Sequence, residues 1–309
     1  MQLKPNLLGN QNIWQSLIHD FQNHNMAHAY LFSGPVGVGK ASTAKEYIKY
    51  ILQANDVLAK RIEEDNFLDL LILNNQEKNE ITVDMVRKAG SFFEQTPTEC
   101  PYKFVIIDSV DDLNINAANS LLKIIEEPRN NTYIFLISHA PYSLLATIRS
   151  RCRIIRFRPL ELEQLKAVAD LDYASYMQDL IAGSPNKAIN LLKLEIIPIY
   201  EQFLQLLSDD NFNAFDKFLD KIANNQDKWN IIKELSIYAL VKCIKIAANA
   251  IKLDQLSDLE SKILTPIAFK KSLPEWFKIY DKLTELFVNE EVYNLDKKQV
   301  LFIAIKKII

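Results

Sequence analysis

The sequence predicts an α/β chain, with a parallel sheet covered by helices on both faces in its first half and an all-helical second half. Short apolar runs alternate with helix-period segments as far as residue 158, an order typical of parallel strands joined by crossover helices. From Pro159 onward, Leu, Ile, Phe and Tyr recur every three or four residues, which is the period of helices that bury one face. The length of 309 residues exceeds what one hydrophobic core usually organises, so we expect more than one domain.

The predicted elements of the first half follow one another in regular alternation. The expected strands cover residues 29–33, 67–73, 103–107, 132–137 and 153–157. The expected helices cover residues 11–24, 40–53, 82–94, 115–126 and 143–149. In the second half, Gly183-Ser184-Pro185 interrupts the helical pattern, and the polar stretch 208–213 is a second expected boundary. We therefore predict three domains, covering residues 1–159, 160–205 and 206–309.

Composition and charge narrow the class of protein. The net charge is −3, and neither half has the positive excess of a stand-alone nucleic-acid binder. Cys100, Cys152 and Cys243 are far apart and form no Cys-x-x-Cys pair, so we expect free thiols, no zinc and no other metal site. The longest stretch without a charge, residues 130–148, contains polar residues and a proline. We therefore expect no membrane span, no secretory signal and a cytoplasmic location.

A glycine cluster indicates a phosphate-binding loop. Three of the six glycines, Gly34, Gly37 and Gly39, lie in the run from Gly34 to Lys40, which follows a predicted strand and opens a predicted helix. In this context glycines let backbone amides, including that of Val38, turn toward phosphate oxygens at a helix N-terminus. Lys40 is expected to reach the terminal phosphates. The alternative is a tight strand-to-helix turn that binds nothing.

Two positions of this predicted site lack groups that ATP hydrolysis needs. The residue after the lysine usually offers a hydroxyl to Mg²⁺, and here it is Ala41. Ser42 lies about 100° further round the helix, where its hydroxyl is poorly aimed. Asp108 ends a buried strand and is placed to back the metal, but Ser109 occupies the position of the glutamate that often orients the attacking water. We expect weak binding of ATP or ADP at most, with no required cofactor.

An arginine cluster is the second uneven distribution. The chain has eight arginines, and five of them fall within ten residues: Arg149, Arg151, Arg153, Arg156 and Arg158. After Arg158 every positively charged side chain is a lysine. The cluster therefore indicates a role that needs the planar guanidinium group and not just a positive charge. The alternative is a set of surface or strand-edge charges.

Further motifs occur in the order and spacing of bacterial clamp-loader subunits. They are residues 28–35, Thr96-Pro97, 103–108, 117–123, Glu126-Glu127-Pro128 and 148–152. Over about residues 1–190, the chain thus resembles the AAA+ clamp-loader subunits of DNA polymerase III. The blunted phosphate loop fits the delta-prime type of this family better than the gamma/tau motor type. The C-terminal hundred residues agree only in length and helical character.

The resemblance implies an architecture and a role. The first two predicted domains would be an AAA+ module with a small helical lid, and the third a collar that oligomerises with other subunits. The chain would help to load the sliding clamp on primed DNA within the DNA polymerase III holoenzyme. Its partners would be gamma/tau-type and delta-type subunits, with the clamp and DNA reached through the complex.

The resemblance also assigns roles to single residues. Ser150-Arg151-Cys152 matches the arginine-finger element, so Arg151 would act on ATP bound by a neighbouring subunit. Lys187 occupies the position of the second sensor, usually an arginine, and Ser138 or His139 that of the first. Segment 54–80 has no cysteine, so the zinc module of some relatives would be absent.

Other interpretations stay open at this point. One is a catalytically competent phosphate-loop ATPase, of gamma/tau type or autonomous, in which Ser42 and Asp111 replace the missing groups; a solvated helix cap is the preferred interpretation of Asp111 and Asp112. Another is a purely structural AAA+ scaffold in which Arg151 touches nothing. Apolar residues of the bundle are expected to supply part of the collar interface: Phe203, Leu206, Phe215, Phe218, Leu219, Leu240, Leu264, Phe269 and Phe277.

Overall fold

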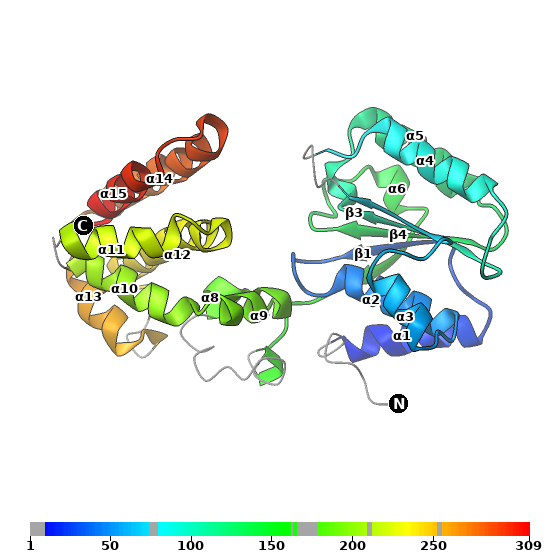
Figure 1. Cartoon of the computed structure of the whole chain (residues 1–309), viewed down its shortest axis with the longest axis horizontal. Coiled ribbons are helices and arrows are strands. Elements are labelled where there is room, and N and C mark those ends of the chain that lie inside the picture. Colours follow the sequence, from blue (N-terminus) through cyan, green and yellow to red (C-terminus); the bar gives the residue numbers. More distant parts are fainter. Residues whose placement is uncertain (1–9, 75–79, 162, 166–177, 209–211, 252–254) are drawn as a thin grey trace. The chain divides into compact units, whose positions relative to one another are not determined.

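The computed structural model describes residues 10–74, 80–161, 163–165, 178–208, 212–251 and 255–309 (Figure 1). Contacts between these residues divide the chain into two compact units. The first unit contains the sheet and Ile181–Ala188, and the second contains Ile189–Ile309. The three-domain division of the sequence stays a prediction. The polar stretch 208–213 includes residues 209–211, which lie outside the described residues, and the division between residues 205 and 206 falls inside a helix, Ile196–Ser208.

Five parallel strands form the sheet of the first unit. They are β1 (Ala29–Ser33), β2 (Leu70–Asn74), β3 (Lys103–Asp108), β4 (Thr132–Ser138) and β5 (Arg153–Arg156). Their order is β2-β3-β4-β1-β5, so β1 lies between two neighbours and β5 is an edge strand. All five predicted strands are present. β2 begins three residues later than predicted, because a turn closed by the hydrogen bond from Leu70 N to Phe67 O, 3.2 Å long, precedes it.

Helices cover both faces of this sheet (Figure 1). On one face lie α1 (Gln11–Gln22), α2 (Lys40–Ile51) and α3 (Asp56–Glu63), and on the other α4 (Val83–Glu94) and α5 (Ile115–Glu126). Successive residues of a strand point to opposite faces. Thus Phe104 and Ile106 of β3 pack against the first group of helices, while Val105 and Ile107 pack against the second. Burial on both faces explains why the strands are continuous apolar runs.

Two helices differ from the sequence prediction. The sequence does not predict α3, because this helix has eight residues and Ile62 is the one of them that is fully buried, which leaves little apolar periodicity to detect. Its start is nevertheless defined, since the side chain of Asn55 accepts a hydrogen bond of 2.9 Å from Leu58 N. The helix predicted over 143–149 is shorter, and α6 covers Ala146–Arg149.

The second half of the chain is helical throughout its described residues, as predicted. Its helices are α8 (Gln178–Ile181), α9 (Pro185–Lys193), α10 (Ile196–Ser208), α11 (Phe212–Ile222), α12 (Gln226–Ala247), α13 (Asp258–Ala268), α14 (Leu273–Tyr293) and α15 (Lys297–Ile308). Trp229 of α12 and Trp276 of α14 are fully buried. No helix in the described ranges combines the length and apolar character needed to cross a membrane.

Most apolar residues expected at a collar interface belong instead to the core of this unit. Phe203, Leu206, Phe218, Leu219, Leu240 and Leu264 are buried. Phe215 packs edge-on against Phe302, with ring centroids 5.7 Å apart. Only Phe269 and Phe277 of the nine are exposed. Helical periodicity does not distinguish the face that packs against the chain itself from the face that is left exposed, so it could not show which of these residues are accessible. That some of them form a collar stays a prediction.

Buried charges tie the helices of the second unit together. Lys242 Nζ lies 2.5 Å from Glu260 Oε1, and the hydroxyl of Tyr200 donates to the same oxygen at 2.7 Å. Both charged side chains are almost fully buried. A second carboxylate, Glu290, accepts hydrogen bonds of 3.0 Å from Trp229 Nε1 and from Lys233 Nζ. Each charge is thus paired and hydrogen-bonded, which a buried charge requires.

Breaking one of these pairs is expected to destabilise the second unit. Lys242→Met removes the cation and leaves the Glu260 carboxylate buried without its counter-charge, which should lower the free energy of unfolding by about 3 to 5 kcal/mol. Lys262→Met, at an exposed position of α13, is the control and should change it by less than about 0.5 kcal/mol. Urea denaturation followed by circular dichroism measures both. Equal effects of the two substitutions would contradict a stabilising role of the buried pair.

Candidate phosphate-binding site

The glycine-rich loop lies where the sequence predicts it, between the end of β1 at Ser33 and the start of α2 at Lys40. Gly39 caps α2 with a φ of 88°, a left-handed conformation that side chains with a Cβ rarely adopt. Gly34 passes so close to Phe157 that a Cβ there would lie 2.5 Å from its carbonyl oxygen. The glycines are therefore required by the backbone path of the loop.

Lys40 is held by the loop that it follows. Its Nζ donates to Gly34 O at 2.6 Å and to Pro35 O at 2.5 Å, and lies 2.9 Å from His139 Nδ1. The side chain is buried, and burial lowers the pKa of Lys40 to about 8, although the nearby carboxylates of Asp108 and Asp111 oppose the change. A bound phosphate would have to take Lys40 away from these acceptors.

His139 lies between the lysine and Asp108. It directly follows β4, and Asp108 ends the neighbouring strand β3, so the register of the two strands brings them together. His139 Nε2 is 3.8 Å from Asp108 Oδ1. Burial, with the charge of Lys40, lowers the pKa of His139, which favours a neutral ring whose Nδ1 accepts from Lys40. Burial also raises the pKa of Asp108.

Asp111 has a structural role that sequence reasoning missed. Its carboxylate accepts from Ser138 Oγ at 2.7 Å, from Ser109 Oγ at 3.0 Å and from the backbone N–H groups of His139 and Ala140. It therefore ties the segment after β3 to the end of β4 and is not the solvated cap expected from the sequence. Its hydrogen-bonding capacity is largely used, which counts against a role as a replacement catalytic base.

Two residues beside Ser42 in the first turn of α2 do not offer a free hydroxyl to a magnesium ion. Ala41 packs against the apolar cluster beneath the sheet. The hydroxyl of Thr43 is turned back onto the helix, where it donates to Gly39 O at 2.8 Å. Within the described part of the chain, no group of three or more His, Cys, Asp or Glu side chains is placed to hold a metal ion.

Lys187 lies in the first turn of α9, where its backbone N–H donates to Ser184 Oγ at 3.1 Å. This bond confirms that Ser184 caps the helix after the Gly183 turn. The contacts that hold Lys40 come from the loop itself and from His139. A role of Lys187 toward nucleotide stays a prediction.

Arg151 lies near the amino ends of the strands, whereas the glycine-rich loop lies at their carboxyl ends. Arg151 comes just before β5, and the first residue of β5, Arg153, pairs with Tyr30 near the start of β1. The loop follows the last residue of β1. Arg151 Nη2 is 2.8 Å from Glu126 Oε1, and Nη1 donates to Thr147 O at 3.1 Å. Along the sheet, the backbone of Arg151 and the loop therefore lie beyond opposite ends of β1.

The other arginines of the cluster have different surroundings. Arg153 Nη2 lies 2.8 Å from Asp20 Oδ1, a carboxylate of α1 that is buried. Arg149 donates to Pro141 O at 3.4 Å. Arg156 and Arg158 are exposed along and beyond the edge strand. Charges on an edge strand discourage pairing with another sheet. Arg156 therefore fits the second interpretation of the cluster, in which its arginines are strand-edge charges.

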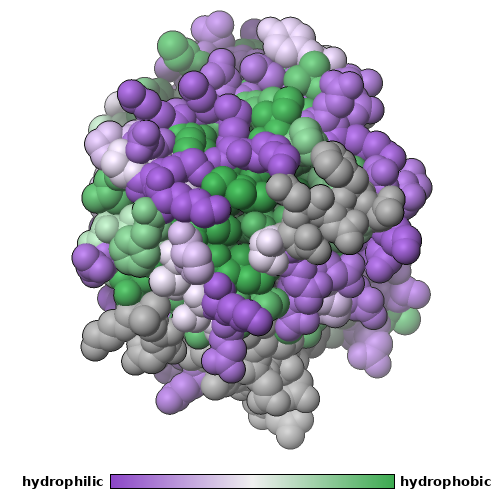
Figure 2. Space-filling model, turned by 90° about the vertical axis from the view of Figure 1, so that its left-hand side faces the viewer, coloured by the Kyte–Doolittle hydropathy of each residue, from purple (hydrophilic) through white to green (hydrophobic). Residues whose placement is uncertain are grey.

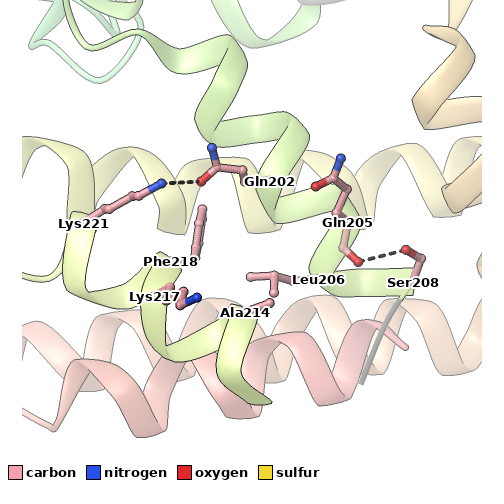
Figure 3. A pocket seen from close by; sticks show the side chains of 8 residues that line it. All are labelled: Gln202, Gln205, Leu206, Ser208, Ala214, Lys217, Phe218 and Lys221. Atoms are coloured by element: carbon pink, nitrogen blue, oxygen red, sulfur yellow. Dashed lines mark hydrogen bonds between the residues drawn. The ribbon is translucent and has the colours of Figure 1, made fainter. Parts of the chain in front are cut away.

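A pocket of about 430 Å³ lies in the second unit, between α10 and α11 (Figure 3). Its walls include Leu206 and Phe218, and Lys221 Nζ donates to Gln202 Oε1 at its rim, 3.4 Å away. No carboxylate, histidine or cysteine is among its lining residues. It therefore offers no acid–base pair and no metal ligands, and we assign it no chemistry.

The parallel sheet, the glycine-rich loop between β1 and α2 and the acidic residue at the end of β3 define an AAA+ phosphate-loop module. Residues 9–161 match the family described as DNA polymerase III, delta subunit. The match covers about half of the chain, and over this half the chain is similar to that family.

Individual relatives agree with this assignment. The chain is 32% identical over 212 residues to the DNA polymerase III subunit delta′ of Pseudomonas aeruginosa, covering 64% of this chain and 63% of that protein. It is 32% identical over 194 residues to the subunit delta′ of Bacillus subtilis, covering 59% and 58%. The matched region thus spans about three fifths of these relatives. A DNA polymerase III gamma subunit-related protein of Thermotoga maritima shares the fold, with a TM-score of 0.54, 15% identity and coverage of 94% and 98%.

The depressed pKa of Lys40 predicts a pH dependence of any nucleotide binding. Below pH 8 the lysine is charged and ready to meet phosphate, whereas above pH 8 it must take up a proton on binding. We expect the affinity to fall with rising pH between 8 and 10, by about tenfold per pH unit at most. Titration with a fluorescent ATP analogue measures this, and Lys40→Arg should remove the dependence. A flat profile of the unaltered protein up to pH 10 would contradict a lysine with a pKa of about 8.

Proposed function

We propose that this chain is a delta-prime-type subunit of a bacterial DNA polymerase III clamp loader. In this role it helps gamma/tau-type and delta-type subunits to load the sliding clamp on primed DNA, in the cytoplasm. The observation that carries the proposal is the family match over residues 9–161, together with two delta′ relatives that are each 32% identical.

The proposal includes a phosphate loop that does not hydrolyse ATP by itself. Ala41 supplies no hydroxyl to Mg²⁺, and Ser109 supplies no carboxylate to orient water. Asp111, the replacement that a competent ATPase of gamma/tau type would need, is held by four hydrogen bonds. Weak ATP or ADP binding through Lys40 is compatible with this site, and turnover is not expected.

Arg151 is proposed to act on ATP held by a neighbouring subunit. Its place beyond the amino end of β5, while the loop follows the carboxyl end of β1, supports action in trans. Its side chain is 40% exposed, which leaves it accessible to a partner. A guanidinium fork that meets phosphate oxygens stabilises charge in the transition state.

The second unit is proposed to form the collar, through the exposed side of α14. Phe277, Tyr280, Val288 and Val292 are all exposed and fall on one side of the helix at 3.6 residues per turn. Figure 2 shows one face of the molecule, on which apolar side chains lie among hydrophilic ones. Exposed apolar residues that gather on one side of a helix suit a protein contact. We therefore assign the collar contact to this side of α14, and not to most of the nine apolar residues that the sequence suggested for it.

The arginine finger is tested in a reconstituted loader in which the other ATP sites are inactivated. Arg151→Ala should lower DNA-stimulated ATP hydrolysis at the remaining, adjacent site by about 10³-fold while assembly is retained. Arg151→Lys should not restore activity, because an ammonium lacks the planar fork.

The control for this experiment is Arg156→Ala, at an exposed position of the edge strand. Arg153 is unsuitable as a control, since its loss would leave the buried carboxylate of Asp20 without its partner. The finger assignment fails if Arg151→Ala and Arg156→Ala have the same activity, or if Arg151→Lys is fully active. The chain would then support the neighbouring ATP site only as a structural scaffold.

The collar surface is tested by placing charge on the apolar side of α14. Phe277→Glu combined with Val288→Glu should abolish incorporation into the loader, measured by size-exclusion chromatography with the partner subunits, and should leave the circular dichroism spectrum unchanged. The control, Lys278→Glu with Lys282→Glu, changes the charge more but lies away from these residues on α14. Normal assembly of the first variant would show that α14 is not the contact surface.

A further inference from the structure

The Glu-Glu-Pro motif has no role in the function proposed so far. Glu126 belongs to the last turn of α5, and Glu127 follows as the residue that caps it. Negative charge at the C-terminal end of a helix opposes the helix dipole, so helix stability does not explain two glutamates there. The two residues differ in one contact, which is the ion pair between Glu126 Oε1 and Arg151 Nη2 at 2.8 Å.

This ion pair holds one side of the arginine fork. The other side is held by Nη1, which donates to Thr147 O at 3.1 Å and lies 3.5 Å from Ser150 Oγ. The contact with Glu126 uses one carboxylate oxygen and one terminal nitrogen. A guanidinium has five N–H donors, so Nε and further N–H groups remain to meet phosphate. With 40% of its side chain exposed, Arg151 is oriented and still accessible.

We infer that Glu126 is a positioning residue, which holds the Arg151 guanidinium in the orientation that a neighbouring subunit's phosphate meets. The inference rests on the proposed function of Arg151. An unrestrained arginine loses rotamer freedom when a partner orders it, and a side chain that is already held loses less. Glu126 does not touch the phosphate and contributes only through Arg151.

The test uses the same reconstituted loader, with one active ATP site next to this chain. Glu126→Ala should lower the kcat of DNA-stimulated hydrolysis about fivefold, the effect expected for an exposed ion pair, with the KM for ATP and assembly unchanged. Glu126→Gln keeps an oxygen that accepts from Arg151 and should retain about half of the activity. Glu127→Ala removes an equal charge from the next residue and should leave kcat unchanged.

A double substitution shows whether Glu126 acts through Arg151. Glu126→Ala combined with Arg151→Ala should be no less active than Arg151→Ala alone, whereas two independent effects would multiply. If Arg151→Ala has no effect, the finger itself is wrong. If Arg151→Ala abolishes turnover but Glu126→Ala behaves like Glu127→Ala, the finger stands and the positioning role is wrong. A rise in kcat on Glu126→Ala would make Glu126 a restraint and would also overturn the inference.

Discussion

The parallel alignment of the five strands is the constraint on which the placement of both candidate sites depends. Because all carboxyl ends meet at one edge of the sheet, the loop after β1, Asp108 after β3 and His139 after β4 come together there. The same alignment sends residues that precede strands to the other edge. Arg151 precedes β5 and is therefore separated from the loop. The topology thus places the glycine-rich loop and Arg151 at opposite ends of the strands.

Backbone carbonyl groups of the glycine-rich loop accept hydrogen bonds from Lys40, as the cost of burying a charge requires. An ammonium removed from water needs acceptors, and Lys40 finds them in Gly34 O, Pro35 O and His139 Nδ1. In this arrangement the ammonium has acceptors without a ligand. When phosphate binds, Lys40 exchanges these acceptors for phosphate oxygens. The net gain in binding free energy is therefore smaller than for a lysine that is exposed to solvent before binding.

Patterns local in sequence predicted most of the fold and the loop. The apolar runs gave all five strands, and the glycine spacing with Lys40 gave the strand–loop–helix unit. What could not be predicted are side-chain pairs between distant segments: Lys40 with His139, Asp111 with Ser138, and Arg151 with Glu126. No periodicity marks such pairs, since each depends on where folding brings two chain segments. The same reason explains why apolar residues of the bundle could not be sorted into core and exposed surface.

The arginine cluster shows how one run of like charges acquires different roles along a few residues. Within β5, alternation sends successive side chains to opposite faces, so Arg153 meets the buried Asp20 of α1 while Ile154 is left exposed. Arg151, outside the strand, is free of that alternation and turns to Glu126 on α5. Arg156 remains in solvent at an edge that no strand covers. Residues of equal formal charge thus form a buried ion pair at Arg153, a charged strand edge at Arg156 and an exposed guanidinium paired with Glu126 at Arg151.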